Sequence, residues 1–265
     1  MGAELAVIEC DPAALSRAIS TAALATAEED PYTEMFVRID GNGIDTPAST
    51  VEAPLASFCT LHPSLFEAFT VFESTAALFP IEPMLDWLAY FEEEQSLTIT
   101  VVGEAGAEYA SAFRFESDRR ELRFDCLDTP ELIEDVEITL PDRFVDTQFL
   151  TESGEPVPTT VETTVEELDR LVEAAARCAG IEMYPLFCRE GTLSFELTGE
   201  RTAVSGTLDA TVDGPAFEHR YGVEFARIVR AVEGQVTLQT GPDHPLAVCC
   251  TEPGVTYRYV LTAGQ

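Results

Sequence analysis

Residues 221–246 read YGVEFARIVRAVEGQVTLQTGPDHPL, and this stretch decides the fold more than any other part of the chain. Its first half predicts a helix over about 223–233, because apolar residues recur at helical spacing and a glycine follows as the stop. These residues are Phe225, Ile228, Val229, Val232 and Gly234. Its second half predicts a strand over 235–240 and a turn rich in glycine and proline.

Three further helices are predicted from capping residues and apolar periodicity. The first begins after the N-cap Asp11 and extends to about Ala27. The second begins near Pro83, and the third follows a capping box of Thr164 with Glu167. Their apolar faces carry Leu15 and Ile19, then Met84, Leu85, Leu88 and Phe91, then Leu168, Leu171, Val172 and Ala175.

Most of the remaining chain predicts β-strands separated by turn residues. In the first half these are 4–9, 35–40, 97–102, 109–115 and 121–126. In the second half they are 182–188, 192–197, 203–212, 235–240, 246–250 and 256–261. Antiparallel sheets with a few helices on one side form an α+β fold, which is the class that we predict.

The predicted elements repeat, although the two halves share almost no sequence. A pattern of strand, helix, several strands, helix and several strands ends near residue 127 and starts again near 158. We therefore predict an N-terminal domain over 1–127 and a C-terminal domain over 158–265. The segment 128–157 between them is rich in Asp, Glu, Pro and Thr, and is predicted to be a connector that packs on the surface.

The charge of the chain indicates a habitat rather than a partner. It has 265 residues and 48 acidic against 15 basic side chains, a formal net charge of -33, and every basic residue is arginine. A folded, acidic chain without lysine is typical of adaptation to molar salt, where self-repulsion is screened. An ordinary acidic protein is the alternative. No apolar run is long enough to cross a membrane, and the N-terminus lacks a basic signal region, so we expect a cytoplasmic protein.

A search for catalytic or metal-binding motifs finds none. There is no nucleophile elbow, phosphate loop, dinucleotide fingerprint or zinc motif, and we expect no cofactor and no metal. The seven cysteines show no CxxC spacing and are expected to be buried thiols. The three histidines are expected in turns or at the surface.

The C-terminal motifs resemble those of the sliding clamps of the proliferating cell nuclear antigen (PCNA) family. The stretch 221–246 is similar to the last helix and hairpin of a clamp, which ends in a Gly-x-Asp-x-Pro-Leu turn. The ending Tyr259-Val260-Leu261-Thr262-Ala263 resembles the closing strand of the family, with Thr262 and Ala263 in place of its usual residues. The strand at 4–9 followed by a helix, and the run 126–131, resemble the opening of archaeal clamps and the entry to their connecting loop.

This resemblance implies a ring of two-domain subunits, with antiparallel sheets outside and four helices on the inner face around duplex DNA. The DNA-facing residues would be arginines on three of the helices: Arg17, Arg170, Arg177, Arg227 and Arg230. An ordinary solvated helix face is the other interpretation of these side chains. Contact with double-stranded DNA would be non-specific and topological.

The resemblance also implies a pocket for client peptides of the PIP-box type and an interface between subunits. The pocket would involve Leu127, Ile133, Pro245, Val260, Leu261 and Thr262, which alternatively pin the connector down. The interface would pair edge strands, here 109–115 and 181–187. Its residues would be Tyr109, Ala110, Phe113, Phe115, Ile181, Met183, Tyr184 and Phe187.

The hypothesis from the sequence is a homotrimeric, non-enzymatic processivity factor that binds DNA polymerase, a clamp loader and other clients, in a halophilic archaeon or one of its viruses. A clamp-derived adaptor or decoy that binds peptides without encircling DNA is the first alternative. An enzyme or small-ligand protein with a two-domain α+β fold is the second.

Overall fold

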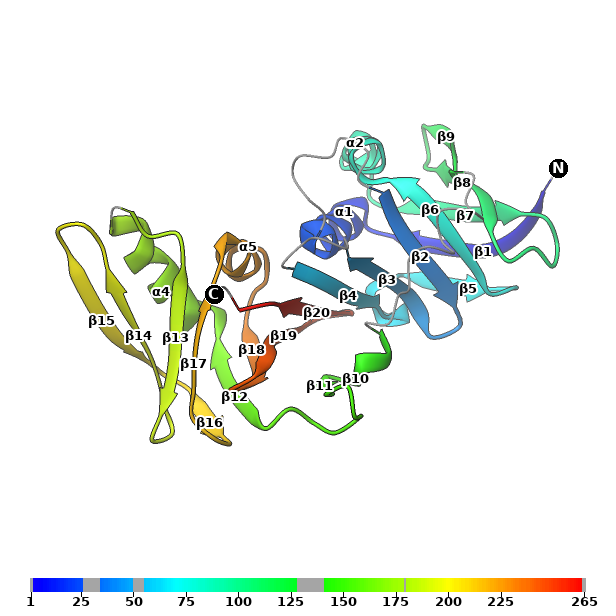
Figure 1. The fold of residues 1–265 in the computed structure, drawn as a ribbon. Coiled ribbons are helices and arrows are strands. Elements are labelled where there is room, and N and C mark those ends of the chain that lie inside the picture. The colour runs from blue at the N-terminus through cyan, green and yellow to red at the C-terminus, as the bar shows by residue number, and fades with distance from the viewer. Residues whose placement is uncertain (1, 26–33, 50–54, 128–140, 179, 264–265) are drawn as a thin grey trace. The chain divides into compact units, whose positions relative to one another are not determined.

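The computed structural model describes residues 2–25, 34–49, 55–127, 141–178 and 180–263 (Figure 1). The chain forms two compact units. Unit 1 lies within 1–49, 57–138 and 253–256, and unit 2 within 50–56, 139–252 and 257–265. No helix in the described ranges is both long enough and apolar enough to cross a bilayer.

The described residues of unit 1 form two α-helices and nine strands. The helices are α1 (Pro12–Ala22), continued by a short 3-10 turn at Ala23–Ala25, and α2 (Ile81–Phe91). The strands are β1 (Ala3–Cys10), β2 (Glu34–Asp40), β3 (Gly43–Ser49), β4 (Leu55–Leu61), β5 (Ala68–Val71), β6 (Thr75–Pro80), β7 (Leu97–Gly103), β8 (Ala110–Glu116) and β9 (Glu121–Asp125).

Unit 2 repeats this pattern after a short hairpin. The hairpin strands are β10 (Phe144–Val145) and β11 (Gln148–Phe149), and the helices are α4 (Val165–Arg177) and α5 (Val223–Ala231). The other strands are β12 (Thr159–Thr164), β13 (Tyr184–Arg189), β14 (Thr192–Thr198), β15 (Ala203–Leu208), β16 (Thr211–Asp213), β17 (Phe217–Tyr221), β18 (Gln235–Gly241), β19 (His244–Glu252) and β20 (Val255–Leu261).

The two units have the same strand order. Unit 1 contains the orders β5-β1-β7-β8-β9 and β4-β3-β2-β6, and unit 2 contains β16-β12-β18-β19-β20 and β15-β14-β13-β17. Each strand of unit 1 therefore has a counterpart in unit 2, with β1 matching β12 and β9 matching β20. The predicted α+β fold of two similar halves is confirmed.

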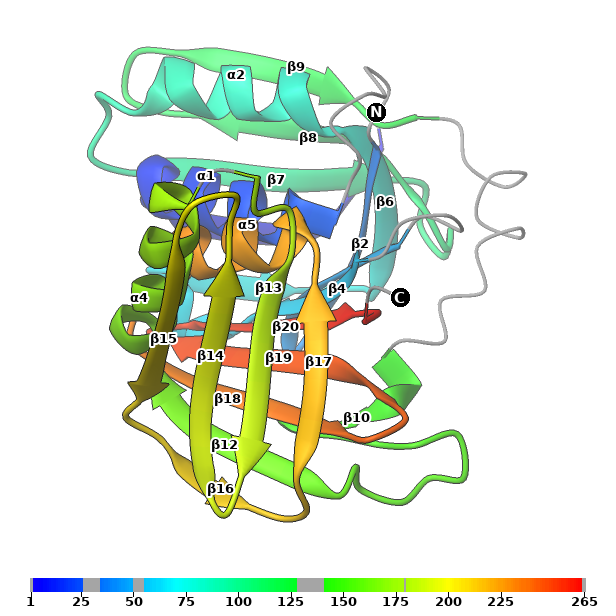
Figure 2. The ribbon, with the colours of Figure 1, turned by 60° about the vertical axis from the view of Figure 1, so that its left-hand side comes forward.

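The helices form because each presents one apolar stripe to its own unit. Helix α1 contacts α2, and α4 contacts α5, so each unit has a pair of neighbouring helices (Figure 2). The buried side chains of α4 are Leu168, Leu171, Val172 and Ala175, as predicted. Helix α2 begins two residues before the predicted start, and the predicted end of the first helix at Ala27 lies outside the described residues.

The first helix of each unit is capped by a side chain. The Asp11 carboxylate accepts a hydrogen bond from the Ala13 N–H at 2.9 Å, and the Thr164 hydroxyl accepts one from the Glu167 N–H at 3.3 Å. Only this half of the predicted capping box forms. The Glu167 carboxylate instead accepts a hydrogen bond from the backbone N–H of Asp209 at 2.9 Å, which ties α4 to the loop after β15.

Several strands were not predicted. Pro, Gly, Thr or charged residues mask the alternation of apolar and polar residues in β3, β4, β5, β6, β12 and β17. The predicted strand 203–212 is divided into β15 and β16. The expectation of exposed histidines was wrong for His219, which faces the core between Phe217 and Tyr221. It is 9% exposed, and its Nε2 lies 2.7 Å from the Gly241 carbonyl oxygen.

Candidate DNA, client and subunit surfaces

Helix α4 carries two arginines that are already paired with carboxylates on the same helix. The Arg170 guanidinium lies 2.8 Å from Glu167, and the Arg177 guanidinium lies 2.9 Å from Glu173. The hydrogen bond from the Asp209 backbone N–H lowers the pKa of Glu167 below its ordinary value, and the Arg170 guanidinium lowers it to a smaller extent. This carboxylate therefore stays ionised. A DNA phosphate would have to compete with these glutamates for the arginines.

Helix α5 presents its two arginines away from its buried face. That face consists of Phe225, Ala226, Ile228 and Val229, whereas Arg230 is exposed and Arg227 is half-buried. Arg17 is exposed on α1. Because α4 contacts α5, four of the five arginines expected to face DNA lie on one pair of neighbouring helices in unit 2. These arginines were named from the resemblance and from their positions on the predicted helices, and their contact with DNA stays a prediction.

Helix α2 has a different surface, which sequence reasoning did not single out. Trp87 and Tyr90 are 39% and 50% exposed, and their rings meet edge to face at 5.7 Å. The Arg120 guanidinium, from the β8–β9 turn, lies 4.2 Å from the centre of the Tyr90 ring. Arg120 also lies 3.6 Å from Glu94, so the end of α2 is a cluster of aromatic, acidic and basic groups. The spacing of Trp87 and Tyr90 at i and i+3 was the available signal.

The strands predicted to be free edges are not edges. β8 contains Ala110, Phe113 and Phe115 and lies between β7 and β9, and Tyr109 directly precedes it. β13 contains Tyr184 and Phe187 and lies between β14 and β17, with Ile181 and Met183 before it. The alternation of apolar and polar residues predicted correctly that these segments are strands. It could not predict their neighbours in the sheet, because these depend on pairing with distant segments. Among the described strands, β5, β6, β9, β15, β16 and β17 lie at the ends of the larger sheets; of these, β9 is paired only with β8, and β15 only with β14.

Residues 141–157 include a hairpin that is anchored to unit 2 by buried polar side chains. Gln239 on β18 accepts a hydrogen bond from the Phe149 N–H at 2.5 Å and donates one to the Thr147 carbonyl oxygen at 2.9 Å. Arg258 on β20 donates from Nε to the Asp146 carbonyl oxygen at 2.7 Å. The rings of Phe144 and Phe149 lie 5.0 Å apart between these contacts. This part of the predicted connector is a packed element, whereas the apolar residues on which the packing prediction rested, within 132–140, lie outside the described residues.

The cysteines do not form a reactive or metal-binding centre within the described residues. All seven are free thiols, and only Cys126 is not fully buried. Burial raises the pKa of Cys10 and of Cys249 to about 12, so neither is a thiolate at neutral pH. The described ranges contain no group of three or more His, Cys, Asp or Glu side chains that could hold a metal ion.

Comparison with solved structures finds the same fold over nearly the whole chain. The structure of PCNA from A. fulgidus, bound by the C-terminal region of FEN-1, has a TM-score of 0.75 at 11% identity and covers 98% of this chain and 99% of that one. PCNA from Entamoeba histolytica has a TM-score of 0.73 at 9% identity, with 99% and 100% covered. PCNA from Thermococcus kodakaraensis has a TM-score of 0.71 at 16% identity, with 98% and 100% covered.

The chain has the fold of the PCNA sliding clamps. No family model matches the chain, and no curated protein sequence matches it. At 9–16% identity to these PCNA structures, the likeness concerns the fold, and the role of each surface has to be argued from its own residues.

Placed on this PCNA fold, the residues predicted for a client pocket fall in both units. Leu127 is half-buried against Phe36, Ala76 and Leu78 in unit 1. The other described members lie in unit 2, where Pro245 and Val260 are half-buried, Leu261 is buried and Thr262 is exposed. Ile133 lies outside the described residues.

Proposed function

We propose that this protein is a DNA sliding clamp, a ring-forming processivity factor that encircles duplex DNA and tethers DNA polymerase and other replication and repair proteins. The observation that carries the proposal is the match to PCNA structures along nearly the full length of both chains. The role is mechanical rather than catalytic, in the cytoplasm of a halophilic archaeon or of a cell infected by its virus. The absence of lysine supports the halophilic source.

Ring closure would use two of the sheet-end strands, β9 and β15. They lie in different units and have different sequences, so pairing β9 of one copy with β15 of the next is a head-to-tail contact. Such contacts close into a ring when the rotation between copies permits it, and the family resemblance implies a homotrimer. β15 (Ala203–Leu208) contains no charged residue, which is unusual for a strand edge that stays in solvent.

Contact with DNA would be made mainly by α4 and α5 and would be weak. Arg170 and Arg177 form ion pairs with glutamates of the same helix. Molar salt also removes most of the DNA affinity that counterion release would provide. A ring does not need tight phosphate contacts, because the DNA passes through it. We expect mobility along duplex DNA without reading of base sequence.

Client proteins would bind through short hydrophobic peptides. The PCNA of A. fulgidus is seen with the C-terminal region of FEN-1, and the PCNA fold of this chain supports the same class of partner. A clamp loader, DNA polymerase and other proteins with PIP-box-type peptides are the partners that we propose. The pocket would include Leu127, Ile133, Pro245, Val260, Leu261 and Thr262.

The test is the absolute mass by light scattering on a sizing column in molar KCl, followed by retention on nicked circular DNA. We expect the mass of three chains and a complex that is lost when the DNA is linearised. Val204→Glu places a carboxylate on β15, where Val204 is 38% exposed, and should yield monomers. Thr70→Glu on β5, the other edge of the β9 sheet, is the matched control and should keep the wild-type mass.

The alternative is a clamp-derived adaptor that binds client peptides without encircling DNA. The acidic and aromatic surface of α2, and the pairing of both α4 arginines with glutamates, favour it. A monomeric mass at micromolar concentration, together with binding of a PIP-box-type peptide, would establish this function instead.

A further inference from the structure

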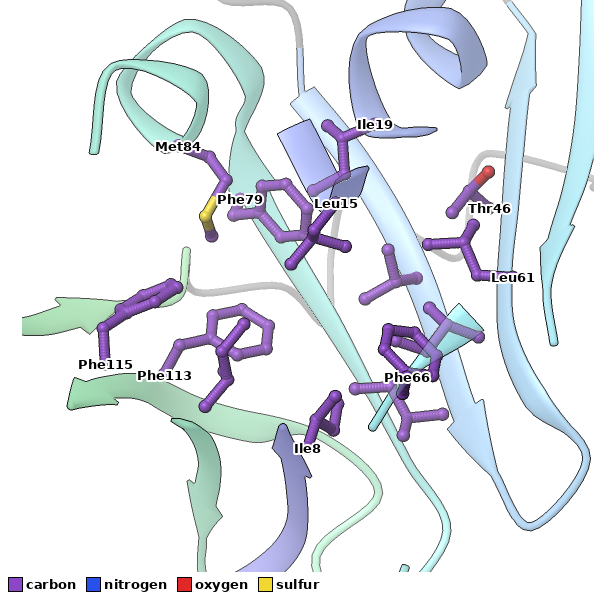
Figure 3. Close-up of a pocket in the computed structure, with 14 residues that line it drawn as sticks. Ile8, Leu15, Ile19, Thr46, Leu61, Phe66, Phe79, Met84, Phe113 and Phe115 are labelled. Atoms are coloured by element: carbon purple, nitrogen blue, oxygen red, sulfur yellow. The ribbon is translucent and has the colours of Figure 1, made fainter. Parts of the chain in front are cut away.

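The interior of unit 1 contains an apolar cavity of about 50 Å³. Figure 3 shows side chains from α1, α2 and the surrounding strands pointing toward it, including Leu15, Met84 and Phe113. All the residues that line the cavity belong to unit 1, and each is at most 9% exposed. The cavity therefore lies inside the core and does not depend on contact between the units.

The lining offers almost nothing for water to bind. Thr46 is the one polar side chain among the 14 that line the cavity, and it is 1% exposed. Its hydroxyl donates to the Cys59 carbonyl oxygen at 3.5 Å. A buried water needs two to four polar partners, so a cavity with this lining stays dry.

The repeated fold explains why the space exists. The β2–β3 hairpin pairs Ile39 with Ile44, and the β13–β14 hairpin pairs Cys188 with Leu193 at the same distance from the turn. Two residues after Ile44 and Leu193, Thr46 in unit 1 and Phe195 in unit 2 therefore occupy equivalent positions. Phe195 is 5% exposed, so unit 2 buries an aromatic ring where unit 1 buries a small side chain.

We infer that the cavity is a binding site for a small, uncharged, apolar molecule. A site for one water takes roughly 10–15 Å³ measured in the same way, so the cavity holds on the order of four heavy atoms, or one xenon atom. A charged or hydrogen-bonding ligand is excluded, because it would lose its hydration without gaining a partner. This site is independent of the proposed clamp function.

Xenon is the probe, and the methionine methyl groups report its position. The chain has four methionines, so a sample labelled with ¹³C at these methyls gives few signals. Met84 lines the cavity, Met35 pairs with the lining residue Phe79 without lining the cavity itself, and Met183 lies in unit 2. We expect the Met84 signal to shift and saturate with xenon pressure while the signal of Met183, the remote control, changes little. Equal, non-saturating shifts at Met84 and Met183 would overturn the proposal.

Two variants separate the cavity from a general effect of xenon. Thr46→Leu adds carbon atoms to the lining and is expected to abolish the saturable shift of Met84. Thr46→Val replaces the hydroxyl with a methyl group of similar size, so the shift should persist. If Thr46→Leu does not fold, Val37→Ile is the second filling variant. A saturable Met84 shift that survives in the folded filling variant contradicts the assignment of the site.

Discussion

In unit 2, Phe195 on β14 lies so close to Gly206 on β15 that a Cβ at Gly206 would come within 2.6 Å of its ring. Unit 1 has Thr46 at the counterpart of Phe195, and a cavity beside it. The strand order of the two units is nevertheless the same. The difference teaches that alternating burial sets the topology, whereas the volume of single core residues is left free to vary.

The helix pairs differ in chemistry as well. α4 and α5 carry four arginines, and α1 and α2 carry Arg17 together with the exposed pair Trp87 and Tyr90. The same buried stripe therefore supports two kinds of outer face, one suited to phosphates and one suited to aromatic or cationic contacts.

The largest expected effect is on core packing in unit 2. Phe195→Ala should lower the free energy of unfolding by about 3–5 kcal/mol, because it removes a buried ring. Thr46→Ala, at the counterpart position, should cost about 1 kcal/mol. Urea denaturation in molar KCl, followed by far-UV circular dichroism, measures both. Equal losses would mean that the two positions are not counterparts.

The second effect concerns the anchored hairpin, which has no counterpart in the described part of unit 1. Thr100 in unit 1 and Gln239 in unit 2 occupy equivalent positions. Val7 on β1 is equivalent to Thr160 on β12, and these two residues pair with Thr100 and Gln239 respectively. Gln239→Ala removes the acceptor of the Phe149 N–H and leaves the Thr147 carbonyl with only the weak Cys249 thiol donor at 3.3 Å, so it should cost about 2 kcal/mol. It should also speed hydrogen exchange at the Phe149 amide, whereas Thr100→Ala should leave that amide protected.

A third comparison concerns the caps that the units share. Asp11→Ala and Thr164→Ala should each cost about 1 kcal/mol, since each removes the side-chain acceptor at a helix N-terminus. Thr164→Ser should keep most of the stability, because its hydroxyl can still accept from the Glu167 N–H. Denaturation midpoints of the three variants test this, and a loss confined to one helix would break the equivalence of α1 and α4.

The smallest effect is a pH dependence that only unit 2 should show. The Asp209 N–H lowers the folded-state pKa of Glu167, so its stabilisation is present above the unfolded-state pKa of about 4.3 and is lost as the pH falls through the folded-state pKa. Glu167→Gln should therefore destabilise the protein at pH 7 and have less effect near pH 3. The counterpart on α1 is Ala14, which carries no charge. Denaturation at both pH values measures the difference, and a constant gap would contradict the assignment.

Local sequence signals predicted the helices and most strands correctly. Capping residues such as Asp11 and apolar spacing such as Leu168 to Ala175 act within a few residues, so they can be recognised without the fold. Edge positions could not be predicted in this way, because whether β8 or β9 ends a sheet depends on pairing between distant segments. The hairpin at 144–149 was hidden for the same reason, since its acceptors and donors lie on Gln239 and Arg258.

The candidate site was only partly predictable. Arginine spacing on α4 indicated one exposed face, but not that Glu167 and Glu173 already occupy both guanidinium groups. The second helix was recognised by its apolar stripe. Its sequence did not show that Trp87 and Tyr90 are exposed, because aromatic side chains are as often found in a core.

The aromatic pair on α2 also gives the protein an optical label of its own. Trp87 is the single tryptophan of the chain, and it is 39% exposed with Tyr90 at 5.7 Å. Its emission therefore comes from one known place on one helix. Anything that covers α2, whether a DNA backbone or a protein, will change the colour and quenching of that emission without any dye attached.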